Sequence, residues 1–388
     1  MNVKELDREY IAGTYARFPV VLTHGSGSLV YDEAGKEYID MGSGIAVNAF
    51  GVADGEWISA VTAQLGKLQH SSNLYFTEPG ALLAEQLCSR TGMKKVFFAN
   101  SGAEANECAI KCARKYAADK YGADRRYKIV TLKNSFHGRT VTTLAATGQD
   151  EYHKLFQPLT PGFVYAEANN CAALRELVEG DESIAAIMFE LVQGEGGVLP
   201  LEYDFVQCIK ELCAERDILM VCDEVQTGNG RTGTFYAWQQ FDIVPDIMST
   251  AKGLGGGLPI GACLMGEKVK DTMTPGTHGS TFGGNPAVCA GALNILGRID
   301  DKLLAEVRAK SEYIVSELSA APGVESVAGL GLMLGVKTAK PLDEVVTACR
   351  ENGVLALTAH GKLRLLPALN IPMELVEKAV AVIKAACE

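Results

Sequence analysis

The middle of the chain alternates short apolar runs with longer segments in which apolar residues recur every three or four positions. A short apolar run predicts a buried β-strand, whereas the longer spacing predicts an amphipathic helix. We expect strands at 95–100, 127–132, 183–190, 218–224, 246–252 and 260–266, and helices at 103–122, 172–180 and 204–217. This α/β alternation, with fully apolar strands, predicts a mostly parallel sheet flanked by helices.

The two ends of the chain follow a different pattern. Residues 27–41 predict a hairpin turned at Glu33–Lys36. The stretch after Pro286 predicts a long helix, a strand–turn–strand over 324–337, a helix near 342–352, a short strand and a terminal helix. Such mixing is typical of an α+β unit. We therefore expect a large α/β domain over 61–285 and a smaller α+β domain built from residues 1–60 and 286–388.

Composition and charge narrow the function classes. The 388 residues have a net charge of -11 and no cluster of Lys and Arg, which argues against nucleic-acid binding. No apolar stretch is long enough to span a membrane, and the first ten residues lack the apolar core of a signal peptide. The 11 cysteines include no C-x-x-C pair, and most are interpreted as small buried residues in a reducing compartment. The 6 histidines are dispersed, which indicates no metal site. From these observations together, we expect a cytoplasmic protein without a metal or membrane partner.

Polar or glycine-rich segments follow five of the predicted elements. They are residues 100–106, 134–140, 190–197, 223–228 and 250–257. Ligands of open parallel sheets bind beyond the carboxyl ends of the strands, so we expect these segments to line one crevice.

Four features of this crevice favour a particular cofactor. Ser101, Gly102 and Ala103 open a helix, where free N–H groups favour a phosphate, although a plain N-cap box of Ser101 with Glu104 is the better explanation of this feature taken alone. Lys252, desolvated at a strand end, would have a lowered pKa and attack carbonyls. With Asp223 for a ring nitrogen and Phe136 for stacking, the set fits pyridoxal phosphate.

Two sequence motifs of nucleotide-binding proteins would indicate a different ligand for this crevice. A phosphate-loop ATPase needs G-x-x-x-x-G-K-[ST], but the Gly-Lys pairs here are followed by Glu or Leu. "GNGRTG" (228–233) matches G-x-G-x-x-G by letter, which leaves a dinucleotide enzyme as a distant alternative because an aromatic stretch follows rather than a clear helix.

Taken together, the motifs resemble those of class III, ornithine-type aminotransferases, which are fold-type I pyridoxal phosphate enzymes. The matching segments, spread over nearly the whole chain, are "SGAEANE", "FHGRT", "FELVQGEGG", "DEVQTGNGRTG", "TAKGLGGGLPIG" and "HGSTFGGNP". The resemblance implies a homodimer with shared active sites. One departure is that "NAFGVADGEW" lacks the histidine and proline that the family often has after this motif.

The resemblance also implies roles for single residues. Lys252 would bond the cofactor's aldehyde and move the proton, and Asp223 would keep the pyridine nitrogen protonated. Gln226 would lie by the ring's 3-oxygen, with Phe136 and Val225 on the two ring faces. The remaining implied cofactor contacts are Ser101, Gly102, Ala103, His137, Glu190 and, from the neighbouring subunit, Ser280 and Thr281.

Substrate choice is implied by a second set of positions. Arg139 and Arg364 resemble the family's carboxylate-binding arginines, which suit glutamate and 2-oxoglutarate, and Glu195 can pair with the second arginine when the donor lacks a second carboxylate. Gly44 and Ile45 stand where ornithine aminotransferases usually carry a tyrosine, which leaves room for an acyl group. Asn73 belongs to the segment that lines the partner's site.

These positions favour an N-acylated ornithine over free ornithine, and they do not separate acetyl from succinyl or acylornithine from acyl-diaminopimelate. With the resemblance, we expect N-acetylornithine as donor and 2-oxoglutarate as acceptor, in arginine biosynthesis. Ornithine, succinylornithine, acyl-diaminopimelate and 4-aminobutyrate remain alternative donors. A binding protein without activity on the same scaffold is the alternative from another function class, and the presence of both Lys252 and Asp223 argues against it.

Overall fold

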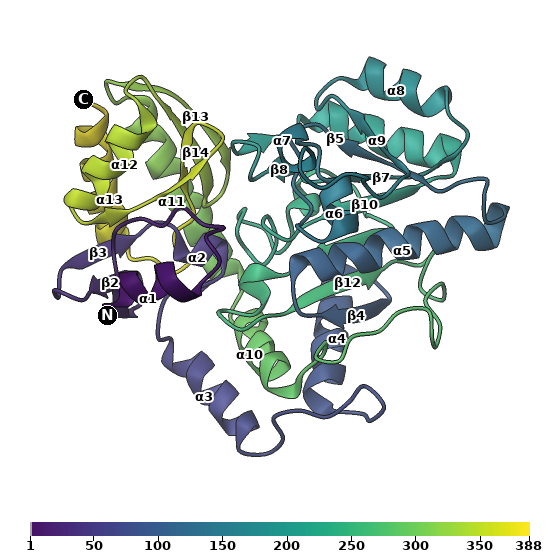
Figure 1. Cartoon of the computed structure of the whole chain (residues 1–388), viewed down its shortest axis with the longest axis horizontal. Coiled ribbons are helices and arrows are strands. Elements are labelled where there is room, and N and C mark those ends of the chain that lie inside the picture. Colours follow the sequence, from purple (N-terminus) through teal and green to yellow (C-terminus); the bar gives the residue numbers. More distant parts are fainter. Residues whose placement is uncertain (1) are drawn as a thin grey trace.

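The computed structural model describes residues 2–388. Figure 1 shows a larger body built on a central sheet and a smaller body that holds both termini. The sheet has the strand order β4-β12-β11-β10-β7-β5-β6. In chain order these strands are β4 (Lys95–Ala99), β5 (Lys128–Leu132), β6 (Phe163–Ala166), β7 (Ile184–Phe189), β10 (Leu219–Asp223), β11 (Ile247–Thr250) and β12 (Gly261–Met265). Only β12 runs antiparallel to its neighbours, which confirms the mostly parallel α/β sheet.

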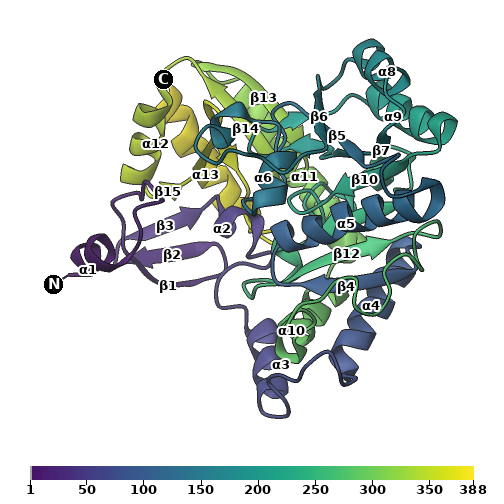
Figure 2. The ribbon, with the colours of Figure 1, turned by 45° about the vertical axis from the view of Figure 1, so that its right-hand side comes forward.

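Helices cover both faces of this sheet, because side chains of a strand alternate between its faces. In β7, Ala186 and Met188 pack in one cluster with α5 (Gly102–Tyr121), whereas Ile187 and Phe189 pack in another with α9 (Tyr203–Arg216). The turned view of Figure 2 shows α5 crossing the sheet in front. The other helices of this body are α4 (Glu78–Thr91), α6 (Val141–Ala146), α7 (Asp150–His153) and α8 (Cys171–Glu179).

The smaller body contains two sheets. One has the order β1-β2-β3-β15, with the predicted hairpin formed by β2 (Leu29–Asp32) and β3 (Glu37–Asp40). The other has the order β13-β14-β17-β16. The remaining strands of the molecule are β1 (Leu22–Ser26), β8 (Val192–Gln193), β9 (Leu199–Pro200), β13 (Val324–Leu330), β14 (Met333–Thr338), β15 (Val354–Leu355), β16 (Leu357–Ala359) and β17 (Lys362–Leu365).

The long helix expected after Pro286 is instead two helices, α10 (Pro286–Gly297) and α11 (Asp301–Ser319). Arg298 between them is held by the Asp54 carboxylate, and Asp300 caps α11 by accepting from the Leu303 N–H. These side-chain contacts end one helix and start the next without breaking the apolar periodicity. The proposed boundary at 60/61 falls within α3 (Gly55–Leu65), and the one at 285/286 falls at the start of α10, which packs on α3 and α4. Both domain boundaries stay predictions.

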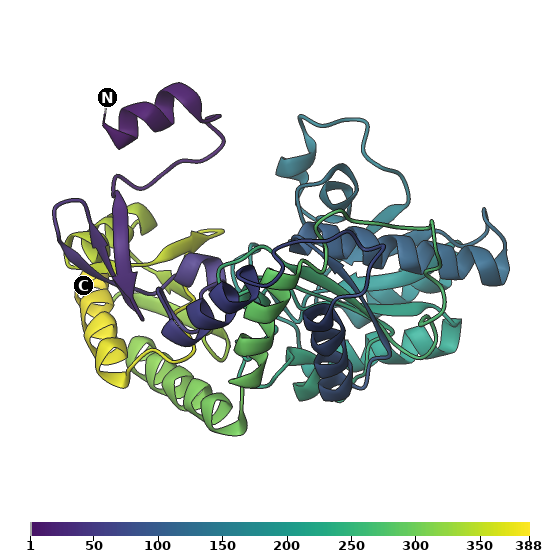
Figure 3. The same ribbon diagram turned by 90° about the horizontal axis from the view of Figure 1, so that it is seen from below.

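The other helices are short or terminal. They are α1 (Val3–Tyr10), α2 (Ser43–Ala46), η1 (Ala237–Gln240), η2 (Lys252–Leu254), α12 (Leu342–Glu351) and α13 (Met373–Cys387). Figure 3 shows α1 standing away from the rest of the smaller body, and none of its residues is buried.

The cysteines differ in part from expectation. Nine are free and eight of these are buried, but Cys171 and Cys208 form a disulfide that joins α8 to α9. Their separation of 37 residues gives no local sequence signal, since only the packing of the two helices brings them together. Between residues 2 and 388 no helix is long and apolar enough to cross a membrane. In the same stretch, no group of three or more His, Cys, Asp or Glu is arranged to hold a metal ion.

Candidate active site

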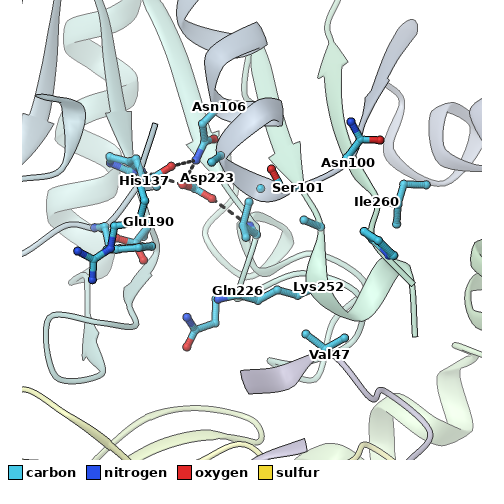
Figure 4. Close-up of a pocket in the computed structure, with 18 of the residues that line it drawn as sticks. Val47, Asn100, Ser101, Asn106, His137, Glu190, Asp223, Gln226, Lys252 and Ile260 are labelled. Carbon is cyan, nitrogen blue, oxygen red and sulfur yellow. Dashed lines mark hydrogen bonds and ion pairs between the residues drawn. The ribbon is translucent and has the colours of Figure 1, made fainter. Parts of the chain in front are cut away.

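A cavity of about 460 Å3 lies beyond the carboxyl ends of the central strands. All five polar segments expected there contribute to its lining, together with Val47, the residue after α2, and the loop 257–260 (Figure 4). The predicted site residues that line it are Ser101, Gly102, Ala103, Phe136, His137, Arg139, Glu190, Asp223, Val225, Gln226 and Lys252. The volume falls in the usual range for small-molecule sites.

Asp223, the last residue of β10, forms the floor of this cavity. Its side chain is 3% exposed, and its carboxylate accepts four hydrogen bonds. The donors are Asn106 Nδ2 (2.7 Å), His137 Nδ1 (2.7 Å), the Val225 N–H (3.0 Å) and Ser249 Oγ (3.3 Å). So many donors fix both the orientation and the place of the negative charge.

His137 and Glu190 lie next to this carboxylate and are both buried. Burial alone would lower the pKa of His137, but the hydrogen bond and charge of Asp223 raise it above its usual value. Burial, reinforced by the nearby charge of Asp223, raises the pKa of Glu190 to about 7. Glu190 accepts hydrogen bonds from the Phe136 N–H (2.8 Å) and the Gly194 N–H (3.2 Å), so it connects two of the loops that form the cavity.

Lys252 directly follows the strand β11 and its Ala251 extension. It has a φ of 47°, which a non-glycine residue adopts only at some cost in free energy. Asn229 braces this turn by donating to Thr250 Oγ1 and to the Ala251 carbonyl. In the described chain, residues 2–388, the Lys252 ammonium makes no hydrogen bond or ion pair, and desolvation lowers its pKa to about 8. A lysine that loses its proton this readily is a nucleophile for carbonyls.

The glycine-rich segment after Lys252 would suit clearance for a cofactor or a neighbouring chain. In the structure, two of its glycines mainly make room for the chain itself. A Cβ at Gly255 would lie 2.0 Å from the Leu258 carbonyl oxygen, and one at Gly256 would lie 2.7 Å from Ile295 of α10. Gly257 alone among them lines the cavity.

The start of α5 provides an anion site. Ser101 is the N-cap and accepts from the Glu104 N–H, so the N-cap interpretation holds. The N–H groups of Gly102 and Ala103 belong to the first helical turn, where no intrahelical acceptor exists, and both residues line the cavity. Gly102 also lets Val225 approach, since a Cβ there would lie 2.6 Å from Val225 Cγ1.

We use the name rim for Arg139, Glu195 and Arg364. Arg139 lines the cavity, whereas Arg364 contacts it through the lining residue Gln226, and Glu195 lines a neighbouring cavity. Arg364 on β17 is buried, and its Nη1 donates to Glu195 Oε1 at 2.5 Å and lies 3.4 Å from Gln226 Oε1. Its Nε is buried without an acceptor in residues 2–388. Burial alone would raise the pKa of Glu195, but the charge and hydrogen bond of Arg364 hold it below its usual value.

Arg139 is the second cation of the rim. Its guanidinium carbon lies 3.9 Å from the centre of the Tyr152 ring and 5.5 Å from that of Phe136. In residues 2–388 it has no acidic partner, and its side chain is exposed. A guanidinium stacked in this way keeps its donors free for a carboxylate.

Besides Glu195 and Arg364, four more predicted site residues do not line the cavity of their own chain. Asn73 donates to the carbonyls of Ser280 and Gly283 (2.9 Å each) and so joins its segment to the loop that carries Thr281. Thr281 is exposed, and Ser280 Oγ accepts from Asn100 Nδ2 at 3.2 Å. Gly44 lies in α2, on the side of a separate cavity.

Two buried side chains with a structural role at or near the site, Asn106 and Arg231, were not among the predicted site residues. Asn106 lies in the quoted "SGAEANE", and its helical position one turn after the anion site was a usable signal. Arg231 lies in "GNGRTG", where the letters suggested a dinucleotide loop. In the structure that segment is a buried turn leading to η1, and Arg231 donates to the carbonyls of Leu332 and Pro367. It therefore connects the two bodies, a role with no local sequence pattern.

The donor set fits pyridoxal phosphate. The helix start suits a phosphate, the Asp223 carboxylate suits a protonated ring nitrogen, and the unpaired Lys252 amine suits an aldehyde. Phe136 and Val225 line the same cavity and can cover the faces of a ring.

Comparison with known proteins agrees with this geometry. The sequence model of the family described as aminotransferase class-III matches residues 10–387. The acetylornithine aminotransferase of Haemophilus ducreyi is 52% identical over 384 residues, which cover 98% of this chain and 97% of that protein.

Solved structures show the same fold. The ornithine aminotransferase of Toxoplasma gondii, whose active site holds pyridoxal phosphate at partial occupancy, superposes with a TM-score of 0.94 at 32% identity, covering 99% of this chain and 93% of that one. The N-acetylornithine aminotransferase of Stenotrophomonas maltophilia superposes with a TM-score of 0.85 at 36% identity, covering 98% and 97%.

Proposed function

Because the chain belongs to the class-III aminotransferases, which are pyridoxal phosphate enzymes, we propose that it transfers the δ-amino group of N-acetylornithine to 2-oxoglutarate. The products are N-acetylglutamate 5-semialdehyde and glutamate, a step of arginine biosynthesis. The rim, where one arginine is free and the other is paired with a glutamate, supports a donor with one carboxylate and an acceptor with two. The similarity to acetylornithine aminotransferases over nearly the whole chain supports the choice of N-acetylornithine among such donors.

The cofactor, when bound, supplies a carbonyl for the amino group and an electron-withdrawing ring. Gly102 and Ala103 would hold its phosphate and Asp223 a proton on its ring nitrogen. Lys252, with its pKa near 8, can both accept and return a proton at neutral pH. His137 and Asn106 keep the Asp223 carboxylate oriented, because both donate to its Oδ2 atom.

Arg139 and Arg364 account for alternation between two substrates. A dicarboxylate would engage both arginines, with Arg364 leaving Glu195 for the ligand. An acylated donor has one carboxylate, which Arg139 can bind while the Arg364–Glu195 pair stays closed. One site can therefore accept both compounds while the buried Arg364 stays paired in either state, and Glu195, whose side chain is 23% exposed, loses its partner only when a dicarboxylate is bound.

A panel of half-reactions tests the donor. Purified enzyme in its pyridoxal form is mixed with acetylornithine, succinylornithine, ornithine, acyl-diaminopimelate or 4-aminobutyrate, and the change in cofactor absorbance is followed. We expect acetylornithine to convert the cofactor fastest. Faster conversion with ornithine or 4-aminobutyrate would replace the proposed donor, and no borohydride-sensitive absorbance band would favour a binding protein.

A homodimer with shared sites is part of the proposal. Next to Asn73, the side chains of Leu74, Tyr75 and Phe76 are exposed, and Phe282 follows Thr281 with 60% exposure. Large apolar side chains gathered on two joined loops favour burial against another protein surface, and a second copy would place Thr281 near the partner's phosphate site.

Hybrid dimers of Lys252→Ala and Thr281→Ala chains test this sharing. In the hybrid, the chain that keeps Lys252 receives Thr281 from its partner. We expect its cofactor affinity to match the wild type, whereas the Thr281→Ala homodimer binds more weakly. Equal weakening in the hybrid and the homodimer would show that Thr281 acts within its own chain.

The domain division at 60/61 and 285/286 and a cytoplasmic location complete the proposal. Nine free cysteines favour a reducing compartment, whereas the Cys171–Cys208 disulfide argues against it. Separate production of residues 61–285 tests the division, since a domain with its own core is expected to fold alone.

A further inference from the structure

A second cavity, of about 300 Å3, lies between the N-terminal segment, α2 and the C-terminal body. Its walls are mainly apolar and include Phe18, Val20, Val346 and Leu357. Gly44 lines this cavity, whereas Val47, three residues later, lines the active-site cavity. The α2 turn therefore separates two cavities. No residue to which we assign a step of the proposed reaction lines the second cavity.

Arg350, in the last turn of α12, is one of two charged side chains in this lining. Its Nη2 donates only to Thr347 Oγ1 of its own helix, at 3.3 Å, and its guanidinium carbon lies 5.8 Å from the centre of the Phe18 ring. Within residues 2–388 it forms no ion pair. A partly buried guanidinium beside apolar walls is poorly solvated and favours an anionic partner.

Asp40, at the end of β3, is the other charged side chain. Its Oδ1 accepts from the N–H groups of Gly42 (2.8 Å) and Ser43 (2.9 Å), and its Oδ2 has no donor in residues 2–388. No cation pairs with it in that part of the chain, and burial raises the pKa of its carboxyl above the usual value. A bound ammonium would offset the free-energy cost of desolvating this carboxylate.

We propose that this cavity binds a free amino acid with an apolar body, whose carboxylate pairs with Arg350 and whose ammonium pairs with Asp40. A simple acid or a simple amine would satisfy only one of the two charges, and a second charged group on the ligand would meet only the apolar walls. The inference rests on the cavity alone and not on the proposed donor or acceptor.

Binding to the holoenzyme, measured by calorimetry in saturating 2-oxoglutarate, tests the charge pattern. The probes are the isomers norleucine and 6-aminohexanoate, with hexanoate and hexylamine as analogues that each lack one charge. We expect one isomer to bind about 10-fold more tightly than either analogue, since each lost charge pair removes a charge-assisted contact. Which isomer binds reports the spacing between the two charges. Hexanoate binding as tightly as both isomers, or no binding by either isomer, would overturn the proposal.

Variants locate the binding. Arg350→Gln should lose the affinity for the amino acid and leave turnover unchanged, whereas Arg125→Gln, an exposed arginine outside the cavity, should change neither. Asp40→Asn keeps an acceptor for Gly42 and Ser43 and should reduce binding to the level of hexanoate. Wild-type affinity in Arg350→Gln, or displacement of the probe by acetylornithine, would show that the ligand lies elsewhere or in an extension of the active site.

Discussion

At the floor of the active-site cavity the Asp223 carboxylate accepts four hydrogen bonds, whereas at the rim Arg364 makes one ion pair and leaves its Nε without an acceptor in residues 2–388. The floor is supplied by strand ends and α5 of one body, and the rim takes Arg364 from the other body. Charge at the floor is therefore fixed by many donors, and charge at the rim can exchange one partner for another. This difference suits a cofactor that stays and substrates that alternate.

The largest expected effect comes from removing the floor's nucleophile. Lys252→Ala should lower turnover by about 1,000-fold or more for every donor, because the proton carrier and the covalent anchor are lost together. The cofactor should remain bound without a borohydride-reducible bond, as shown by absorbance before and after reduction. Lys270→Ala, which changes an exposed lysine paired with Glu267, is the matched control. Turnover within a few-fold of wild type would contradict the mechanism.

At the rim, a change should affect substrates and leave the cofactor in place. Arg139→Ala should raise the KM for 2-oxoglutarate about 10- to 100-fold, since one charge-assisted contact to a carboxylate is lost. Cofactor affinity, measured by equilibrium dialysis, should stay at the wild-type value. Arg125→Ala serves as the control. An unchanged KM would remove Arg139 from the substrate site.

The floor was largely predictable from sequence and the rim only in part. Apolar runs locate strand ends, and strand ends of a parallel sheet meet at one edge, so Asp223, Lys252 and the start of α5 converge without further information. Arg364 reaches the site through pairing of β17 with β14 in the smaller body, which no local pattern encodes. The same is true of Arg231, whose partners Leu332 and Pro367 lie about a hundred residues further along the chain.

A pH titration sharpens the comparison at the floor. The pKa of Lys252 is lowered to about 8, so its uncharged fraction should rise from about 10% at pH 7 to about 90% at pH 9. The rate at which added pyridoxal phosphate becomes borohydride-reducible on the apoenzyme should therefore rise about 10-fold over this range and then level off. The same reaction of N-acetyl-lysine, with an ordinary pKa, should keep rising above pH 9. A protein rate that also keeps rising would show that Lys252 is not desolvated.

The smallest expected effect tests whether the rim charge is exchangeable. In Glu195→Gln, Arg364 keeps a neutral acceptor but loses its competing anion, so a dicarboxylate no longer has to displace a carboxylate. We expect the KM for 2-oxoglutarate to fall about 3- to 10-fold, while the KM for acetylornithine rises by a similar factor because Arg364 then favours a second carboxylate that this donor lacks. Glu179→Gln, an exposed glutamate on α8 paired with Arg175, should change neither constant. If both constants moved in the same direction, the Glu195–Arg364 pair would be holding the shape of the site, and the contrast between a fixed floor and an exchangeable rim would fail.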